Sequence, residues 1–173
     1  RQWREAGAEI LPFSPLMDEG PEDSCDICWL PGGYPELHAA KLAAADRFKT
    51  SLSRFAQTRP VHGECGGYMV LGEGLEDADG ATHRMTGLLS HATSFATRKM
   101  NLGYRQAKIA GDGPLGRAGE VLRGHEFHYA RVIEQGRDLP FATIADGLGS
   151  PLGSSGGRRS HVTGTFFHAI AKG

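Results

Sequence analysis

The stretch Gly63-Glu64-Cys65-Gly66-Gly67 places a single cysteine among glycines, where a strand-like run gives way to an apolar one. This is the cysteine form of the G-x-S-x-G pattern, in which a nucleophile sits on a sharp strand-to-helix turn. The N-terminus of the following helix favours the thiolate and offers a backbone N–H to an oxyanion. The pattern therefore predicts that Cys65 is a nucleophile rather than a buried cysteine at a tight turn.

A thiolate nucleophile needs a proton shuttle, usually a histidine that a third group holds in place. Of the eight histidines in the chain, two are the main contenders. His168 ends a strand-like run at an edge where a sheet presents side chains, and His128 lies in "GHEFHYA". His62 precedes Cys65 in the same strand and is too constrained in direction. Spacing alone does not choose between His168 and His128.

The stretch "LPGGYPE", residues 30–36, ends a predicted strand with two glycines and leads into a helix. Backbone N–H groups at such a turn are not covered by side chains and are able to form an oxyanion hole. An ordinary strand-to-helix turn could have the same sequence, so this stretch indicates an oxyanion hole only when it is considered together with Cys65.

Two motifs suggest metal but do not complete a site. In "RGHEFHYA", residues 123–130, Glu126 and His128 share one face of a strand while His125 faces the other way. The C-x-x-C motif of Cys25 and Cys28 falls in a predicted buried strand, and no second cysteine pair exists to complete a zinc site. We therefore expect no metal in this chain.

The elements that must position these residues indicate one α/β domain. Short apolar runs at 8–13, 25–31 and 59–64 predict buried parallel strands, and the periodicity of 36–58 predicts two helices broken near residue 45. Residues 66–75 predict a short helix. The second half consists of alternating or β-branched runs that predict strands, several of them antiparallel, with a mobile loop at 153–157 before Arg158 and Arg159. This order predicts a mostly parallel sheet extended by antiparallel strands.

Composition narrows the function classes. The chain has 173 residues, a formal net charge of −1 and three cysteines. We expect no nucleic-acid or membrane partner, and a reducing, cytoplasmic setting. The stretch "GDGPLGRA", residues 111–118, has the glycine spacing of a P-loop but lacks its lysine and hydroxyl residue, so we expect no ATP site here. Because the chain opens at Arg1 without a methionine and in mid-pattern, we expect an internal fragment.

Four stretches together, "LPGGYPE", "HGECGGYMVLGE", "RGHEFHYA" and "GTFFHA", resemble a class I (triad-type) glutamine amidotransferase domain. More narrowly, the sequence is similar to the C-terminal domain of the cobyrinic and hydrogenobyrinic acid a,c-diamide synthase family. The resemblance implies a three-layer α/β domain over residues 1–173. It also implies that an N-terminal ATP-binding synthetase domain, and the first strand of this domain, precede Arg1.

The resemblance assigns roles to residues. Cys65 would attack the side-chain amide of glutamine, His168 would be the base, and Gly33 with Gly66 would form the oxyanion hole. The domain would need no cofactor, whereas ATP and Mg would bind the synthetase domain. There the ammonia would amidate the a and c acetate side chains of a corrin substrate in cobalamin biosynthesis. The resemblance also allows a homodimer of the full enzyme and implies that the isolated domain is weakly active or inactive.

One position departs from the wider class. Typical members carry a glutamate two residues after the base, whereas this chain has Ile170 there. We therefore expect a Cys–His dyad or a carboxylate from elsewhere, with Glu126 and His128 as candidates for orienting the base or lining the site. Two other classes stay open: another α/β cysteine hydrolase, such as a peptidase or a stress-protein relative, and a non-catalytic docking domain.

Overall fold

The computed structural model describes residues 2–173, and a short, mainly parallel sheet lies at its centre. Strands β1, β2 and β12 pair in parallel, and β11 adds to β12 in the antiparallel sense, in the order β1-β2-β12-β11. The strands are β1 (Cys28–Leu30), β2 (Val61–Glu64), β11 (Gly157–Arg159) and β12 (Val162–Thr165). This sheet joins residues that are far apart in sequence, because β12 pairs with β2.

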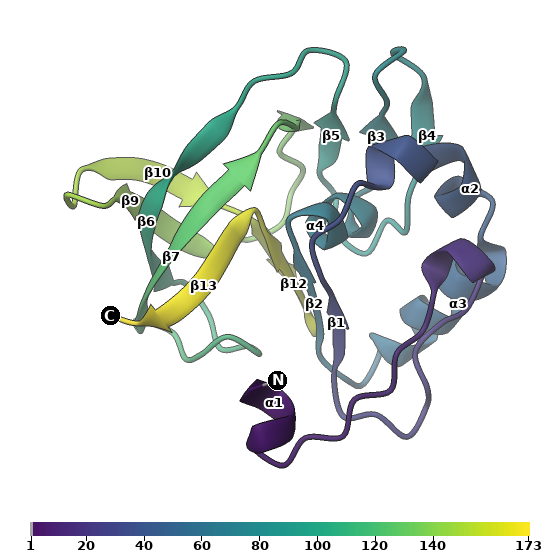
Figure 1. Ribbon diagram of the computed structural model, residues 1–173, viewed down its shortest axis with the longest axis horizontal. Coiled ribbons are helices and arrows are strands. Elements are labelled where there is room, and N and C mark those ends of the chain that lie inside the picture. Colours follow the sequence, from purple (N-terminus) through teal and green to yellow (C-terminus); the bar gives the residue numbers. More distant parts are fainter. Residues whose placement is uncertain (1) are drawn as a thin grey trace.

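A five-stranded antiparallel sheet, in the order β10-β9-β6-β7-β13, lies to the left of the parallel strands in Figure 1. It consists of β6 (Asn101–Ile109), β7 (Val121–His128), β9 (Ala142–Asp146), β10 (Pro151–Ser155) and β13 (Phe167–Lys172). Its inner face has its own apolar core, which includes Ile109, Phe141 and the fully buried Phe167. Since Phe167 fixes the start of β13, the next residue, His168, is held at a defined position.

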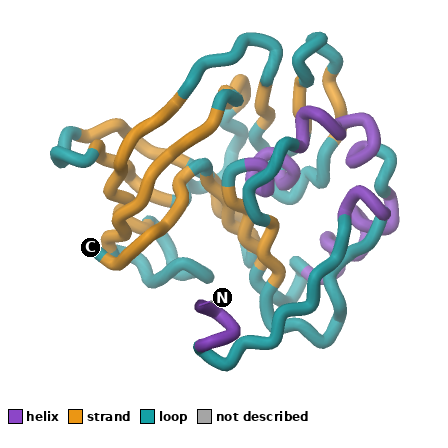
Figure 2. Tube along the Cα trace, viewed as in Figure 1, coloured by secondary structure: helices purple, strands orange, loops and turns teal. Residues whose placement is uncertain are grey.

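Helices α2 (Ala39–Ala43) and α3 (Asp46–Phe55) lie on the other side of the parallel strands, at the right of Figure 1 and Figure 2, whereas α1 (Gln2–Glu5) lies below the sheets. The remaining helical segments are α4 (Gly66–Leu71) and the 3-10 turns at Pro15–Met17 and Pro35–His38. Phe48, Leu52 and Phe55 of α3 are completely buried in the larger apolar core. No helix among residues 2–173 is long and apolar enough to span a membrane.

A third, small sheet in the order β4-β3-β5-β8 completes the fold beyond α4. Its strands are β3 (Gly74–Glu76), β4 (Thr82–Arg84), β5 (Ala92–Ser94) and β8 (Arg131–Glu134). The chain passes from this sheet into β6, returns to it from β7 and leaves it again into β9, so three connections join the small sheet to the antiparallel sheet.

The α/β class expected from the sequence is confirmed, with a parallel centre and antiparallel extensions. Two local predictions are wrong. Residues 8–13 form no strand, and prolines at 12 and 15 limit this stretch because a proline cannot donate a ladder hydrogen bond. Residues 153–157 are not a mobile loop: they belong mostly to β10 and β11, and Arg159 binds Asp138 through Nε at 2.6 Å.

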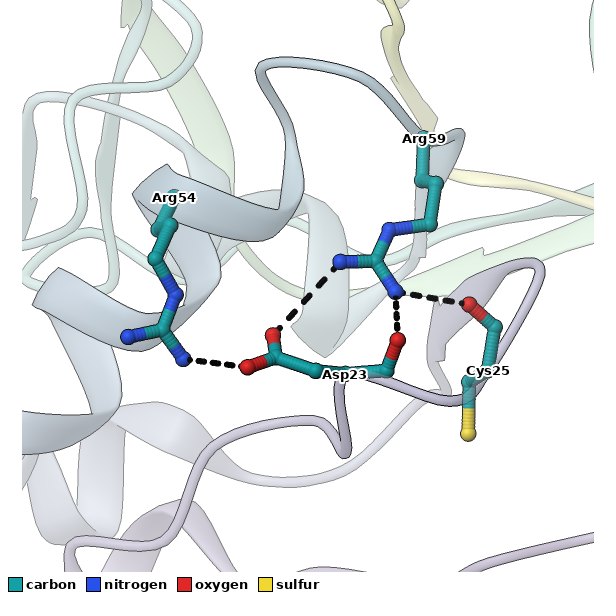
Figure 3. Close-up of polar contacts among 4 residues, drawn as sticks. All are labelled: Asp23, Cys25, Arg54 and Arg59. Atoms are coloured by element: carbon teal, nitrogen blue, oxygen red, sulfur yellow. Dashed lines mark hydrogen bonds and ion pairs between the residues drawn. The ribbon is translucent and has the colours of Figure 1, made fainter.

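The two cysteines of the C-x-x-C motif lie in different elements, one in a loop and one in a strand. Cys25 lies in the loop before β1, Cys28 lies buried in β1, and both are free thiols. Figure 3 shows how the loop is fixed: Asp23 binds Arg54 at 3.0 Å and Arg59 at 3.5 Å, and Arg59 also donates to the Cys25 carbonyl at 3.1 Å. Burial raises the pKa of Cys28 to about 12, which makes this thiol unreactive at neutral pH.

Candidate active site

The strand-to-helix turn predicted at Cys65 is present, because Cys65 directly follows β2 and directly precedes α4. Its backbone has φ 52° and ψ −108°, a conformation that residues with a side chain rarely adopt. The Cys65 N–H donates to the Thr165 carbonyl at 2.9 Å, which ties the turn to the end of β12. The turn therefore presents the sulfur at the C-terminal edge of the parallel strands.

Glycines allow α4 to lie against the sheet at this turn. A Cβ atom at Gly63 would lie 2.7 Å from the Gly67 carbonyl oxygen, and one at Gly67 would lie 2.0 Å from the Leu30 carbonyl oxygen. Neither position has room for a side chain. The glycines around Cys65 are thus required by the close packing of β1, β2 and α4, as the sequence pattern indicated.

The structure brings His168 to Cys65. A Cβ atom built on Gly32 would lie 3.6 Å from both Cys65 Cβ and His168 Cε1, so these two side chains meet above the same glycine. Contact with the Cys65 side chain first, and with the Glu64 carboxylate second, raises the pKa of His168 from 6.5 to about 10, although burial opposes the shift. At neutral pH the imidazole is therefore protonated and lies against the sulfur, an arrangement that favours a thiolate.

Glu64 is the residue that sequence reasoning missed. Its Oε1 lies 2.6 Å from His168 Nδ1, and the two side chains are only 17% and 22% exposed. In a regular strand, neighbouring side chains point to opposite faces, so strand geometry alone does not bring Glu64 and Cys65 to the same group. The only signal in the sequence was the isoleucine at 170, which left either a Cys–His dyad or a carboxylate from elsewhere in the chain.

Glu126 does not orient His168, contrary to one expectation from the sequence. In the antiparallel pairing of β7 with β13, Phe167 lies opposite Glu126 and His168 lies opposite His125. Directly opposed residues share a face, so the Glu126 side chain lies on the other face of the sheet from His168. Its carboxylate instead accepts a hydrogen bond from Arg105 Nε at 2.8 Å.

His128, the other contender for the base, is occupied elsewhere. Its Nδ1 lies 2.9 Å from the Ala130 carbonyl oxygen, and its ring stacks on Phe166 with centroids 3.9 Å apart. Burial, the largest cause, lowers the pKa of His128. The geometry thus separates two histidines that spacing alone left equivalent.

His62 and His91 are buried neutral groups of the core. His62 Nδ1 lies 2.8 Å from Thr163 Oγ1, and His91 Nε2 lies 3.1 Å from the Tyr68 carbonyl oxygen. Burial lowers the pKa of each to about 4. Both rings therefore remain uncharged at neutral pH and serve the packing of the domain.

The "PGGYPE" loop packs against the start of α4. A Cβ atom at Gly66 would lie 2.8 Å from both the nitrogen and the oxygen of Gly33, so the two backbones touch. At Gly33 itself the space is open, with no atom within 4 Å of a built Cβ. Gly66 is the first residue of α4, where N–H groups lack partners within the helix. Gly33 and Gly66 therefore stand next to each other beside the sulfur.

Residues 123–128 of the stretch "RGHEFHYA" form most of β7. The His125 ring stacks on His168 with centroids 5.0 Å apart and planes 15° apart, while the Phe127 carbonyl oxygen lies 3.9 Å from Cys65 Sγ. Among the described residues, no group of three metal-binding side chains lies close enough together to hold an ion. This strand forms one wall of the site through His125 and Phe127.

A cysteine on a strand-to-helix elbow, paired with a histidine at the edge of a parallel sheet, is the arrangement typical of cysteine-dependent hydrolases and acyl-transfer enzymes of α/β type. Residues 3–173 match the family described as the CobB/CobQ-like glutamine amidotransferase domain. The chain belongs to this family.

Curated relatives agree with this assignment. The hydrogenobyrinate a,c-diamide synthase of Agrobacterium fabrum is 78% identical over all of this chain, which covers 40% of that protein. The enzyme of the same name from Mesorhizobium japonicum is 70% identical over 98% of this chain, and that from Rhodobacter capsulatus is 56% identical over 98%. In each of the last two, this chain spans 39% of the relative's length.

The fold has a counterpart among solved structures. A crystal structure of a glutamine amidotransferase superposes with a TM-score of 0.59 at 13% identity, covering 96% of this chain and 80% of that one. At this identity the likeness concerns the fold alone, and it agrees with the α/β class described above.

Proposed function

We propose that this domain hydrolyses glutamine through Cys65 and His168 and supplies the ammonia to a synthetase. The observation that carries this proposal is the contact of His168 with both Cys65 and a carboxylate, on the elbow between β2 and α4. Nucleophile, base and orienting group in contact are the parts that a cysteine-dependent amide hydrolysis requires. Membership of a glutamine amidotransferase family supports glutamine as the amide.

In the first half-reaction, the Cys65 thiolate adds to the side-chain carbonyl carbon of glutamine. The oxyanion that forms is stabilised by backbone N–H groups, for which Gly33 and Gly66 are the proposed donors. The protonated His168 then gives its proton to the leaving nitrogen, so the C–N bond breaks, ammonia leaves and a glutamyl thioester remains.

In the second half-reaction, the neutral His168 accepts a proton from water as the water oxygen adds to the thioester. Collapse of this intermediate breaks the C–S bond, releases glutamate and restores the thiolate beside a protonated imidazole. The raised pKa of His168 fits the acid role of the first half-reaction and the protonated resting state.

The ammonia is used outside this domain. The relatives are named hydrogenobyrinate a,c-diamide synthases, and this chain spans about two fifths of their length. We infer that an N-terminal synthetase domain, with ATP and Mg, amidates the a and c acetate groups of cobyrinic or hydrogenobyrinic acid in cobalamin biosynthesis. We propose the cytoplasm as the location of the full enzyme and a homodimer as its assembly.

The proposal is tested in the full enzyme by comparing two nitrogen donors. Cys65→Ser and His168→Ala should abolish diamide formation from glutamine and leave formation from free ammonia nearly intact, because ammonia bypasses the thioester. His128→Ala is the matched control and should be the milder change. If ammonia-driven synthesis fell as much as glutamine-driven synthesis in His168→Ala, His168 would be acting in synthesis or folding instead.

Labelling provides a second test. A chloroketone analogue of glutamine should alkylate Cys65 in the native enzyme, while Cys28 should react only after unfolding because its thiol is buried. Equal stoichiometry of labelling in Cys65→Ser would refute the assignment of the nucleophile.

A further inference from the structure

The position that carries the orienting carboxylate in typical class I amidotransferases is apolar in this chain. Ile170 is 65% exposed, and the pairing of β13 with β7 is irregular between Ala169 and Ala171. We infer that Glu64, the residue directly before the nucleophile, is the positioning residue that holds His168 for proton transfer. This inference rests on the proposed glutaminase function.

The contact between Glu64 and His168 has the geometry of a charge-assisted hydrogen bond. The Nδ1–H group of His168 donates to Glu64 Oε1 at 2.6 Å, from side chains that are mostly covered. With Nδ1 held by the carboxylate, Nε2 is the ring nitrogen left to exchange protons at Cys65. The carboxylate thus fixes both the orientation of the ring and the nitrogen that carries the reactive proton.

The unusual backbone at Cys65 explains how adjacent residues reach one imidazole. Glu64 ends β2 with ordinary strand pairing, opposite Thr165 of β12. At Cys65 the positive φ of 52° interrupts the alternation of side chains, so the sulfur turns back toward the side on which Glu64 lies. The strained turn therefore does two things: it exposes the nucleophile and it places the nucleophile beside its neighbour's carboxylate.

The strand that precedes His168 fixes the other half of the contact. Thr165 is fully buried, its carbonyl accepts the Cys65 N–H, and its Oγ1 accepts the Phe167 N–H at 3.1 Å. These bonds turn the chain from β12 into β13 directly beside Glu64. Both partners of the 2.6 Å contact are thereby held by backbone pairing, independently of any mobile loop.

Other groups near His168 do not replace Glu64. Glu126 lies on the opposite face of the sheet and binds Arg105, as described above. His125 faces His168 from β7, but it contacts the ring by stacking. Among residues 2–173, Glu64 supplies the carboxylate that hydrogen-bonds to the imidazole.

Removing the charge of Glu64 should change the titration of the catalytic pair. Glu64 is one of the two groups that raise the pKa of His168, together with Cys65. Without it the imidazolium is less stable, so less thiolate forms at neutral pH and the sulfur reacts more like an ordinary thiol. Substitution of a residue with only a structural role would not change the pKa of His168.

The test compares Glu64→Gln and Glu64→Asp with the wild type in the full enzyme. In Glu64→Gln we expect kcat/KM for glutamine to fall about 100-fold, chiefly through kcat, which is the scale of acid–base catalysis. Ammonia-driven synthesis should stay within about twofold, reporting that the protein is folded. Glu64→Asp keeps the carboxylate and should recover part of the loss. Glu73→Gln, which alters an exposed carboxylate just beyond α4, is the matched control.

The second readout is the pH profile of Cys65 alkylation by iodoacetamide. In Glu64→Gln the rate of alkylation at pH 6–7 should fall about tenfold, because the imidazolium that lies against the sulfur loses the carboxylate that stabilises it. Unchanged kcat/KM and an unchanged alkylation profile in Glu64→Gln would overturn the role of Glu64. Glutamine-driven synthesis that persists in Cys65→Ser would instead overturn the proposed function itself, so the two failures are distinguishable.

Discussion

The strained backbone at Cys65 predicts that the usual order of stability of alanine and glycine variants is reversed at this position. At ordinary positions alanine is more stable than glycine by about 0.5–1 kcal/mol, because glycine loses more backbone entropy on folding. At φ 52° and ψ −108° any Cβ atom is strained, at a cost of about 1–3 kcal/mol. The strain outweighs the entropy, so Cys65→Gly should be more stable than Cys65→Ala by about 1 kcal/mol. Because the variants differ by one methyl group, lost packing of the sulfur cancels.

Urea denaturation of both variants measures this difference. In thermal unfolding of a chain of this size, a difference of about 1 kcal/mol corresponds to a Tm difference of about 3 °C. Thr50, on the exposed side of α3, provides the control pair: there Thr50→Ala should be more stable than Thr50→Gly by about 1 kcal/mol. If Cys65→Ala proved as stable as Cys65→Gly while the Thr50 pair behaved normally, the turn would carry no strain and the reasoning would fail.

Three further predictions concern stability. Gly67→Ala should lower the free energy of unfolding by about 2–3 kcal/mol, because its Cβ atom would overlap a carbonyl group of β1. Gly33→Ala should change the free energy of unfolding by less than about 0.5 kcal/mol, and the midpoints of urea denaturation of the two variants test this difference. Arg59→Ala should lower the free energy of unfolding by about 1–2 kcal/mol and Arg54→Ala by less than about 0.5 kcal/mol, because Arg59 also binds two backbone carbonyls (Figure 3). The Arg59 guanidinium also lies 4.2 Å from the centroid of the Phe55 ring, and equal costs for the two variants would contradict this reasoning. Burial lowers the pKa of His91 to about 4, so between pH 6.5 and 4 the unfolded chain binds a proton there that the folded protein does not, and the free energy of unfolding falls as the pH falls. His91→Gln should make the free energy of unfolding depend less steeply on pH in this range. An unchanged dependence on pH would show that His91 does not contribute.

The elbow at Cys65 could be predicted from sequence because its requirements are local. A nucleophile between glycines, after a β-branched run and before an apolar one, is specified within a few residues. The choice of His168 over His128 needed either a family resemblance or the structure, because it depends on the pairing of β7 with β13 and on which face each residue occupies. The alternation of side chains within "RGHEFHYA" was predicted correctly. Which of its two faces lies toward Cys65, however, depends on the pairing of β7 with other strands, which is not a local property of the sequence.

Glu64 could not be assigned from the sequence for a related reason. The rule of alternating side chains separates Glu64 from Cys65, and only the actual φ at Cys65 reverses that conclusion. The strand expected at 8–13 failed in the opposite sense: its composition suits a strand, but the structure provides it with no partner strand. The backbone conformation at Cys65 therefore decided the first case, and pairing with a distant segment decided the second, against local preference.

The position of β12 in the central sheet determines when, during synthesis of the chain, the site around Cys65 is able to form. β12 lies between β2 and β11, and its residues are joined to β2 across roughly a hundred positions of sequence, as in the 101-residue separation of the His62–Thr163 bond. While a ribosome is still adding residues 66–160, the edge of β2 has no β12 beside it and Cys65 has no imidazole. The proposed catalytic pair can assemble only after the chain has been synthesised through β13, so under the proposed function a nascent chain would not hydrolyse glutamine. The same topology exposes an unpaired strand edge throughout elongation, which makes timely completion of the last two strands the step at which folding competes with aggregation.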